Sequence, residues 1–82
     1  MTVDVKIFPI AGLCNKKQEL QIALEEGNMG ELRRLLPERL GVNLPGPEAF
    51  MFLYNGRALR QQEDVFFQDG DQLWLLPQIS GG

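Results

Sequence analysis

Few side chains in this sequence could perform chemistry. Its 82 residues contain no histidine and a single cysteine, Cys14. Histidine is the commonest general acid–base and metal ligand, so its absence excludes catalytic triads and histidine-based metal sites. Cys14 lacks the usual activating base of a nucleophile, which favours a structural or loop thiol. Because phosphate loops, dinucleotide fingerprints and metal-spaced cysteines are missing as well, we expect no catalysis by these side chains and no metal or cofactor bound by this chain.

A main-chain group is the other candidate, because the sequence ends PQISGG, with Gly81 and Gly82 in the last two places. Glycine has no side chain to pack and loses the most backbone freedom on ordering, so this pair adds nothing to a core. The composition predicts a single folded domain over residues 1–77 and a flexible tail over 78–82. The elements before the tail decide whether it is functional or only a frayed terminus.

Size and charge narrow the class of protein. A chain of 82 residues has room for one domain with one modest core. Its net charge of −3 and its pI of about 4.8 argue against nucleic-acid binding, which requires a basic patch or stripe. The apolar runs are far too short for a membrane span, and the start MTVDVKIF shows no secretory signal. We therefore expect a cytoplasmic protein with a reduced thiol, since one cysteine forms no internal disulfide.

Apolar periodicity predicts the strands. The segments TVDVKIF (2–8) and ELQIALEE (19–26) alternate apolar and polar residues, the pattern of strands with one buried face. In AFMFLYNGRAL (49–59) an apolar strand leads into Asn55-Gly56, the favoured pair for a type I′ turn, after which a short strand returns. The segment QLWLLP (72–77) is apolar on both faces, which is typical of a central strand.

One segment has the period of a helix instead. Asn28 is a good N-cap residue, and Glu31 follows at the spacing of a capping box. We expect a helix over 29–36, because Pro37 removes a backbone hydrogen bond and its ring clashes with the preceding turn. A kink or a fresh short turn then reaches Gly41, a plausible C-terminal stop.

The predicted order is strand, strand, helix, strand, short strand, strand. A helix between two hairpins favours a mixed sheet of four to five strands with the helix packed across one face. The fold class predicted is therefore α+β, in the β-grasp (ubiquitin-like) arrangement.

The sequence resembles a known family. The element order, the length, the YNGRAL and DGD turns and the terminal GG together resemble the ubiquitin-like sulfur carriers of the MoaD/ThiS family. The stretch QDGDQLWLLPQISGG (68–82) is similar to the end of MoaD-type proteins, the small subunit of molybdopterin synthase. ThiS, the thiamine-pathway carrier, ends in a similar way. MoaD-type tails typically have a proline pair at the strand end, where this chain has Pro77 followed by Gln78.

The resemblance implies a function for the tail. A partner similar to ubiquitin-activating enzymes, of the MoeB/ThiF type, would adenylylate the carboxylate of Gly82, which then becomes a thiocarboxylate. That partner would hold the ATP and Mg²⁺. The large subunit of molybdopterin synthase (MoaE type), or another acceptor enzyme, would receive the sulfur. Glycine suits the task because a thread without Cβ atoms can enter narrow active sites. Gly81 would be the slender neighbour of Gly82. Gln78, Ile79 and Ser80 would form a spacer, in which Ile79 and Ser80 contact the partner and Ile79 is an anchor in the partner's groove.

Besides the tail, the alternation of side chains along the strands predicts a surface that could bind a partner. If the last strand buries its odd-numbered residues, Trp74 and Leu76 face away from the helix. The strand before the Asn55-Gly56 turn adds Leu53. Met51 of the same strand, or Phe8 of the segment 2–8, lies at the margin of this cluster. An exposed apolar cluster of this kind marks a protein interface, which we expect to bind the partner. The alternatives are that the proline-rich loop before this strand covers the cluster, or that the protein dimerises through it.

Other functions remain open at the level of sequence. The chain could be a ubiquitin-like modifier joined to lysines through Gly82, or a passive interaction domain with an incidental GG end. Among carriers, a thiamine-type protein and one for sulfur amino acid synthesis are alternatives to the molybdopterin type. In none of these roles is the chain an enzyme by itself.

Overall fold

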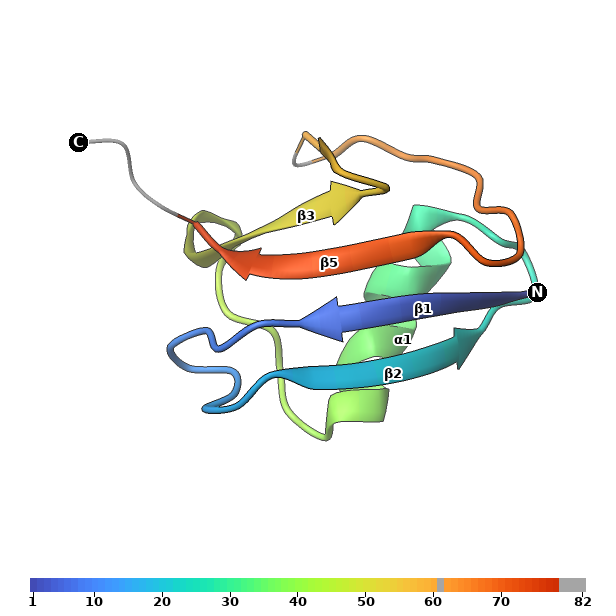
Figure 1. Ribbon diagram of the computed structural model, residues 1–82. Coiled ribbons are helices and arrows are strands. Elements are labelled where there is room, and N and C mark those ends of the chain that lie inside the picture. The colour runs from blue at the N-terminus through green and yellow to red at the C-terminus, as the bar shows by residue number, and fades with distance from the viewer. Residues whose placement is uncertain (61, 79–82) are drawn as a thin grey trace.

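The arrangement of the elements follows the predicted order. The computed structural model describes residues 1–60 and 62–78 of the chain. Its elements are β1 (Thr2–Ile7), β2 (Gln18–Ala23), α1 (Met29–Leu40), the short 3-10 helix η1 (Pro47–Ala49), β3 (Phe50–Tyr54), β4 (Arg57–Ala58) and β5 (Gln72–Pro77). The strands form one sheet in the order β2-β1-β5-β3-β4, and α1 crosses one face of it (Figure 1).

The sheet is mixed. Strand β5 pairs in parallel with β1 and antiparallel with β3, while β2 and β4 lie at the two edges. Two parallel strands need a long connection, and the connection between β1 and β5 includes α1. The two-layer β-grasp arrangement expected from the sequence is confirmed.

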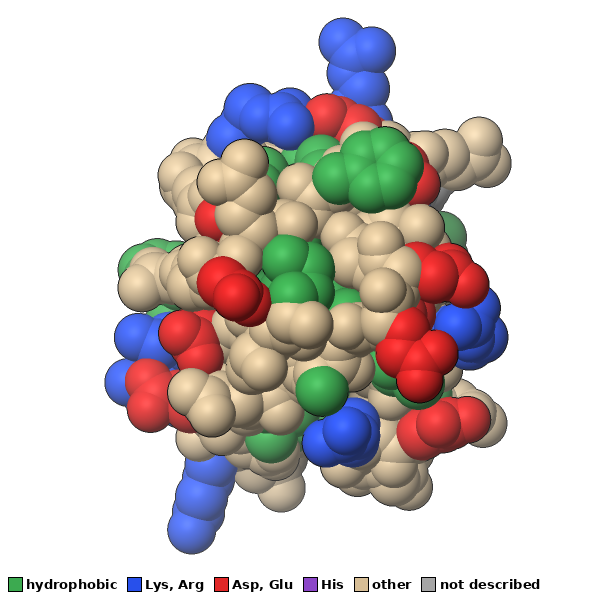
Figure 2. Space-filling view, turned by 90° about the vertical axis from the view of Figure 1, so that its right-hand side faces the viewer, with side chains coloured by type: hydrophobic (Ala, Val, Ile, Leu, Met, Phe, Trp, Pro, Cys, Tyr) green, Lys and Arg blue, Asp and Glu red, His purple; other side chains and the backbone are tan. Residues whose placement is uncertain are grey.

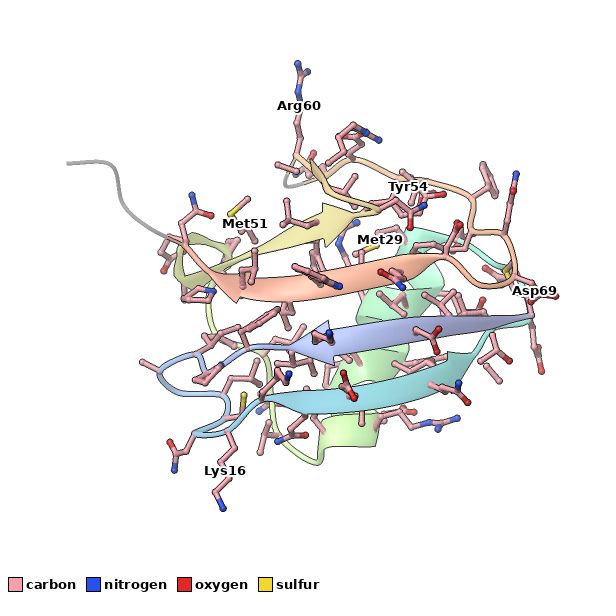
Figure 3. All side chains as sticks on the ribbon, in the orientation of Figure 1. Lys16, Met29, Met51, Tyr54, Arg60 and Asp69 are labelled. Carbon is pink, nitrogen blue, oxygen red and sulfur yellow. The ribbon has the colours of Figure 1, made fainter. Side chains whose placement is uncertain are left out.

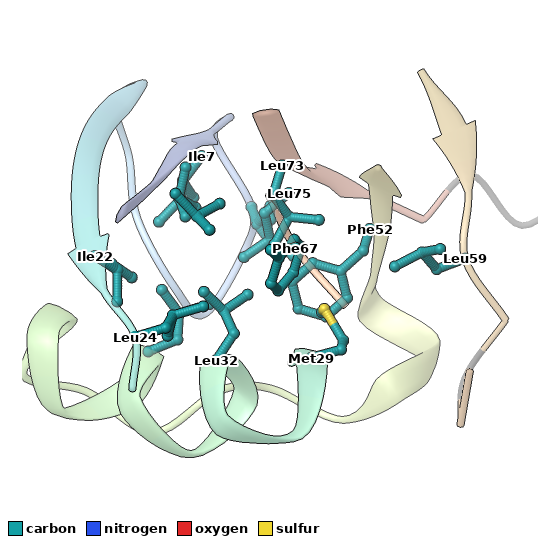
Figure 4. Packing of buried hydrophobic residues seen from close by; sticks show 14 residues of the cluster. Ile7, Ile22, Leu24, Met29, Leu32, Phe52, Leu59, Phe67, Leu73 and Leu75 are labelled. Atoms are coloured by element: carbon teal, nitrogen blue, oxygen red, sulfur yellow. The ribbon is translucent and has the colours of Figure 1, made fainter. Parts of the chain in front are cut away.

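The core lies between the sheet and the helix. The strands contribute side chains at alternate positions, as the period of 2 requires, and α1 contributes residues three and four positions apart (Figure 4). The residues that are 0–1% exposed are Val3, Val5, Ile7, Ile22, Met29, Leu32, Leu36, Leu73 and Leu75. Burying one such side chain contributes roughly 1.5–3 kcal/mol, so this layer is the main source of stability.

The start of α1 is fixed by two side chains. Asn28 Oδ1 accepts a hydrogen bond from the backbone N–H of Glu31 at 2.8 Å, which confirms the predicted N-cap. In a capping box the Glu31 side chain would accept a hydrogen bond from the backbone N–H of Asn28, but here it accepts three other bonds. The Glu31 carboxylate, only 5% exposed, accepts from the backbone N–H groups of Glu25 (2.8 Å), Glu26 (2.8 Å) and Gly27 (3.0 Å).

This carboxylate also explains where β2 ends. The sequence predicted a strand over 19–26, but β2 stops at Ala23. Beyond Leu24 the backbone N–H groups turn towards Glu31 and no longer towards β1. The loop from β2 to α1 is therefore folded around a buried acid.

The predicted end of the helix at residue 36 is wrong. One helix runs from Met29 to Leu40 with Pro37 inside it. Pro37 has no N–H to donate, but its own carbonyl accepts from Gly41 N at 2.8 Å, which completes the last turn. Gly41 has φ 74°, a left-handed conformation that glycine adopts readily, so the predicted stop is confirmed. Burial of Leu36 and packing of Leu40 against the core keep the helix on the sheet across the proline.

The role of Glu31 predicts how stability depends on pH. The N–H of Glu25 and those of Gly27 and Glu26 lower the pKa of Glu31 below its ordinary value of 4.5, although burial opposes them. A lowered folded-state pKa gives stability that is present above the unfolded-state value and is lost as pH falls through the folded-state value. We expect Glu31→Gln to be less stable than the native chain at neutral pH, and to lose less stability between neutral pH and about pH 3.

Urea unfolding at the two pH values measures both quantities. The matched control is Glu38→Gln, which changes an exposed acid on the same helix. Equal pH dependence in Glu31→Gln and the native chain would contradict the assignment.

Candidate functional site

The face of the sheet away from α1 carries an apolar surface. Its members are half-buried side chains at alternate positions, and we call them the open face: Phe8, Met51, Leu53, Trp74 and Leu76. Leu53 lies directly opposite Trp74 in the register of β3 and β5, and Met51 lies opposite Leu76. Figure 1 shows this face towards the viewer with α1 behind it. The structure therefore brings the predicted Leu53, Trp74 and Leu76 together.

Trp74 is held in place at the centre of the open face. Its ring centroid lies 5.4 Å from that of Phe8, with the planes tilted by 57°. Lys6 Nζ lies 5.2 Å from the Trp74 centroid, and Lys6 is itself paired with Glu19 at 3.4 Å. A tryptophan in contact with an aromatic ring and a cation has less side-chain freedom to lose when a partner binds it.

The chain leaves the sheet beside this face. β5 ends at Pro77, and the backbone N–H of Gln78 donates to the carbonyl of Ala49 at 3.0 Å. The predicted spacer and reacting residues come next, and Ile79, Ser80, Gly81 and Gly82 lie outside the described residues. One strand thus supplies two members of the open face and leads to the chain end.

Two turns at the other end of the sheet bind each other. The Asp71 carboxylate accepts from Tyr54 Oη at 2.6 Å, Asn55 Nδ2 at 3.2 Å and the backbone N–H of Gln68 at 2.9 Å. Asn55 Oδ1 in turn accepts from Gln72 N at 2.9 Å. We call Tyr54, Asn55, Asp71 and Gln72 the turn clasp. Asn55 and Gly56 have φ values of 48° and 88°, as the predicted type I′ turn requires.

The clasp changes the acid–base properties of its members. The hydrogen bond to Asp71 raises the pKa of Tyr54 above its ordinary value of 10.0, and burial and the Asp71 charge add to this. Burial raises the pKa of Asp71, but hydrogen bonds from Tyr54, Gln68 and Asn55 outweigh it and leave that pKa below the ordinary value. Asp71 is therefore a charged structural acceptor that joins β3 to β5.

Cys14 is the remaining candidate side chain. Cys14 is half-buried in the loop between β1 and β2, with Sγ 3.5 Å from the carbonyl oxygen of Phe8. Within residues 1–60 and 62–78, acidic and sulfur-bearing side chains form no cluster suited to a metal ion. The one α-helix of this region is too short and too polar to cross a lipid bilayer.

One exposed aromatic residue was missed by the sequence reasoning. Phe66 is 74% exposed, and its backbone forms a bridge with Asn28 at the start of α1. Figure 2 shows hydrophobic side chains among acidic ones on one face of the molecule. The neighbours of Phe66 are anchored, because Phe67 N donates to Gly27 O at 2.7 Å and Met29 N donates to Val65 O at 3.1 Å. Val65, Phe66 and Phe67 are all apolar, so no alternation of apolar and polar residues in the sequence marks Phe66 as the exposed one.

Comparisons with known proteins agree with this architecture. No protein-family model matches the sequence, and no curated protein matches it significantly. Solved structures do match. SAMP1 from Haloferax volcanii has 21% sequence identity and a TM-score of 0.64, with 100% of both chains covered. A ubiquitin-like protein from the hyperthermophilic archaeon Caldiarchaeum subterraneum has 20% identity and a TM-score of 0.55, with 99% of this chain and 100% of that one covered.

The chain has the ubiquitin-like β-grasp fold. At these identities the likeness concerns the fold alone. In this β-grasp domain the open face, the chain end and the clasp all depend on β5, so the candidate site is organised around a single strand.

The clasp generates a prediction for a single titrating group. Tyr54 is the only tyrosine, so the rise in phenolate absorbance with pH reports its ionisation alone. In the native chain we expect its midpoint above 10.0, because the hydrogen bond to the Asp71 carboxylate favours the neutral phenol. Asp71→Asn should lower the midpoint towards 10.0 and reduce stability by about 1 kcal/mol, since it removes a charge-assisted hydrogen bond.

The matched control is Asp4→Asn, an exposed acid outside the clasp, which should leave the midpoint unchanged. A native midpoint at or below the ordinary phenol value would contradict the clasp.

Proposed function

We propose that the protein is a sulfur carrier that works through the carboxylate of Gly82. The observation that carries the proposal is that β5 forms the centre of the open face and that its last residue, Pro77, is followed after three residues by Gly81-Gly82. A partner that binds Trp74 and Leu76 therefore holds the strand from which the reactive end extends. The segment 78–82 spans at most about 18 Å when fully extended, which sets how far the partner's active site lies from the sheet.

The proposed chemistry has two steps. The Gly82 carboxylate attacks the α-phosphate of ATP, and pyrophosphate leaves to give an acyl-adenylate. A sulfide nucleophile then attacks the acyl carbon and AMP leaves, which yields the thiocarboxylate. The activating partner, an adenylyltransferase of the MoeB/ThiF type, supplies ATP and Mg²⁺, and this chain supplies the carboxylate and the surface for binding.

For the acceptor we propose the molybdopterin pathway, with the thiocarboxylate delivered to a MoaE-type large subunit in the cytoplasm. The support is the likeness of 68–82 to the end of MoaD-type proteins. Pro77 ends β5, and Gln78 takes the place of the second proline of that type while its N–H bonds to Ala49. A thiamine-pathway carrier uses the same chemistry with a different acceptor.

A ubiquitin-like protein modifier is the second candidate. It is favoured by the description of the Caldiarchaeum subterraneum neighbour as a ubiquitin-like protein. The activation step is the same, but a lysine amine then attacks the activated Gly82 and forms an isopeptide bond. The two candidates differ only in the nucleophile that takes over the acyl group.

Intact-mass spectrometry separates the candidates. After incubation with the activating partner, ATP, Mg²⁺ and sulfide, we expect the chain to gain the mass difference between one sulfur and one oxygen atom. Deletion of Gly82 should abolish the gain while circular dichroism of the fold stays unchanged. Slower-migrating conjugates that depend on Gly82, with no gain in mass, would favour the modifier instead. A native protein that extends beyond Gly82 and is not cleaved there by a protease would contradict both candidates.

Substitution on the open face tests partner binding. We expect Trp74→Ala to weaken binding to the activating partner by about 2 kcal/mol, roughly 30-fold, because a rigid aromatic anchor is lost. The control is Phe66→Ala, which removes an exposed aromatic ring elsewhere and should change the affinity less than twofold. Titration calorimetry measures both, and equal effects of the two variants would refute the assignment of the open face.

A further inference from the structure

Strand β2 forms one edge of the sheet and pairs with β1 alone. Leu24 N donates to Met1 O at 2.8 Å and Met1 N donates to Leu24 O at 3.1 Å, so these two residues exchange both of their main-chain hydrogen bonds. In an antiparallel pair such an exchange recurs at every second residue. The main-chain groups of Ile22, Leu20 and Gln18 therefore point towards β1 as well.

The alternate residues of β2 direct their main-chain groups outward. They are Glu19, Gln21 and Ala23, and all three are exposed. Within residues 1–60 and 62–78, no further hydrogen bond satisfies their N–H and C=O groups. Figure 1 shows β2 at the border of the sheet, with no strand on its outer side. A free strand edge of this kind pairs readily with another strand.

The two ends of β2 carry opposite charges. Lys16 and Lys17 immediately precede the strand, and Glu25 and Glu26 follow its end after one further residue. All four are exposed, and no salt bridge in the described part of the chain involves them. Lys16 extends away from the sheet beside the start of β2 (Figure 3). Lys17 and Glu25 are each four positions from Gln21, and Lys16 and Glu26 are each five.

Neighbouring charges do not cancel this difference between the ends. Two cations lie near the glutamates: the Met1 ammonium and Arg34 of α1. Two further carboxylates offset them, because Glu31 is three positions before Arg34 on the helix, and Asp69 accepts from Thr2 N at 3.1 Å beside the chain start. At the lysine end, the ion pair that joins β1 to β2 at 3.4 Å adds no net charge.

We propose that β2 pairs with β2 of a second copy of this chain, antiparallel and about a two-fold axis at Gln21. In this register Gln21 lies opposite its own counterpart, and Glu19 lies opposite Ala23 of the second copy. All three residues then exchange both main-chain hydrogen bonds across the axis. The same edge serves both copies, so the contact closes at two chains and forms no fibre.

The charges select this register. It brings Lys17 near Glu25 of the second copy and Lys16 near Glu26, at both ends of the paired strands. The backbone leaves the sheet beyond Leu24, so these contacts depend on the length of the lysine side chains. Sliding one copy by two residues sets two glutamates opposite each other in one direction and the lysines opposite apolar residues in the other. Parallel pairing would place like charges side by side.

The proposed dimer leaves the candidate site free. Residues opposite each other in a ladder point to the same face, so the joined sheet carries both α1 helices on one face and both open faces on the other. β1 separates β2 from β5, and the contact involves no residue after Glu26. The inference goes beyond the chemistry of Gly82 and stands without it. A chain lacking Gly81 and Gly82 should dimerise like the native one, which separates failure of the dimer from failure of the carrier chemistry.

Sedimentation equilibrium over a dilution series of the full chain tests the proposal. Pairing of two strand edges buries little surface, so we expect a reversible dimer of modest affinity, with a Kd below about 1 mM. The amide NMR signals of Glu19, Gln21 and Ala23 should shift with concentration. A chain that stays monomeric up to about 1 mM, or shifts confined to another element, would overturn the proposal.

Complementary charge reversal tests the register. The double variants Lys16→Glu/Lys17→Glu and Glu25→Lys/Glu26→Lys should each dimerise about tenfold more weakly, because like charges then meet at both ends of the paired strands. Mixed in equal amounts, the two variants should form a heterodimer with nearly native affinity, since opposite charges meet again. Failure of the mixture to recover affinity would overturn the proposed register.

The matched control is Arg57→Glu/Arg60→Glu, which changes the net charge as the lysine variant does. Arg57 belongs to β4, at the opposite edge of the sheet, and Arg60 follows it closely. This control should alter the Kd less than about threefold, because its charges lie far from the axis and are screened by salt. An effect equal to that of the lysine variant would assign the weakening to net charge and contradict the pairing of β2.

A proline tests the main-chain contact itself. Gln21→Pro removes an N–H that is unpaired in the single chain, a position where an edge strand tolerates proline. We expect this variant to keep the circular dichroism of the native fold and to lose dimerisation, whereas Gln21→Ala, which retains the N–H, should still dimerise. Native affinity in Gln21→Pro would contradict pairing through the main chain.

Discussion

The pairing of β5 on both of its edges is the interaction on which the rest of the structure depends. It joins β1 in parallel and β3 antiparallel, so its six residues connect the two hairpins into one sheet. Leu73 and Leu75 are fully buried on the side of α1, while Trp74 and Leu76 form part of the open face. The apolar run that reads as a central strand thus serves the core on one side and the candidate interface on the other. A shift of its register by one residue would exchange these two sets of residues, because the side-chain period is two.

Two carboxylates fix the loops, whose conformations the burial of apolar side chains does not determine. Asp71 and Glu31 each accept three hydrogen bonds, and each fixes a loop whose backbone would otherwise lack partners. The turn clasp joins the end of β3 to the start of β5, at the end of the sheet opposite to the exit of the chain (Figure 1). One end of the domain is therefore tied together by charged acceptors, and the other carries the segment that the proposed chemistry uses.

Much of this architecture could be read from local patterns. The alternation in 2–8, the apolar run in 72–77, the Asn55-Gly56 pair and the Asn28 cap each act over a few residues, and each prediction from them is confirmed in its essentials. The features that were missed depend on contacts between distant residues. Pro37 remains in the helix because Leu36 and Leu40 pack on the sheet, which outweighs the local cost of the proline. Likewise the bond from Tyr54 to Asp71 spans 17 positions. The apolar periodicity of a single segment does not predict such contacts between distant residues.

The position of β5 has a consequence for the synthesis of the protein. This strand leaves the ribosome after all the others, yet it must be inserted between β1 and β3. Until it arrives, both neighbours keep an unpaired edge and expose apolar surface, which is the state that chaperones and proteases recognise. A prematurely terminated polypeptide lacking β5 has no route to the closed sheet, so cellular quality control would remove products that lack the carboxyl-terminal region before they could compete with the complete protein.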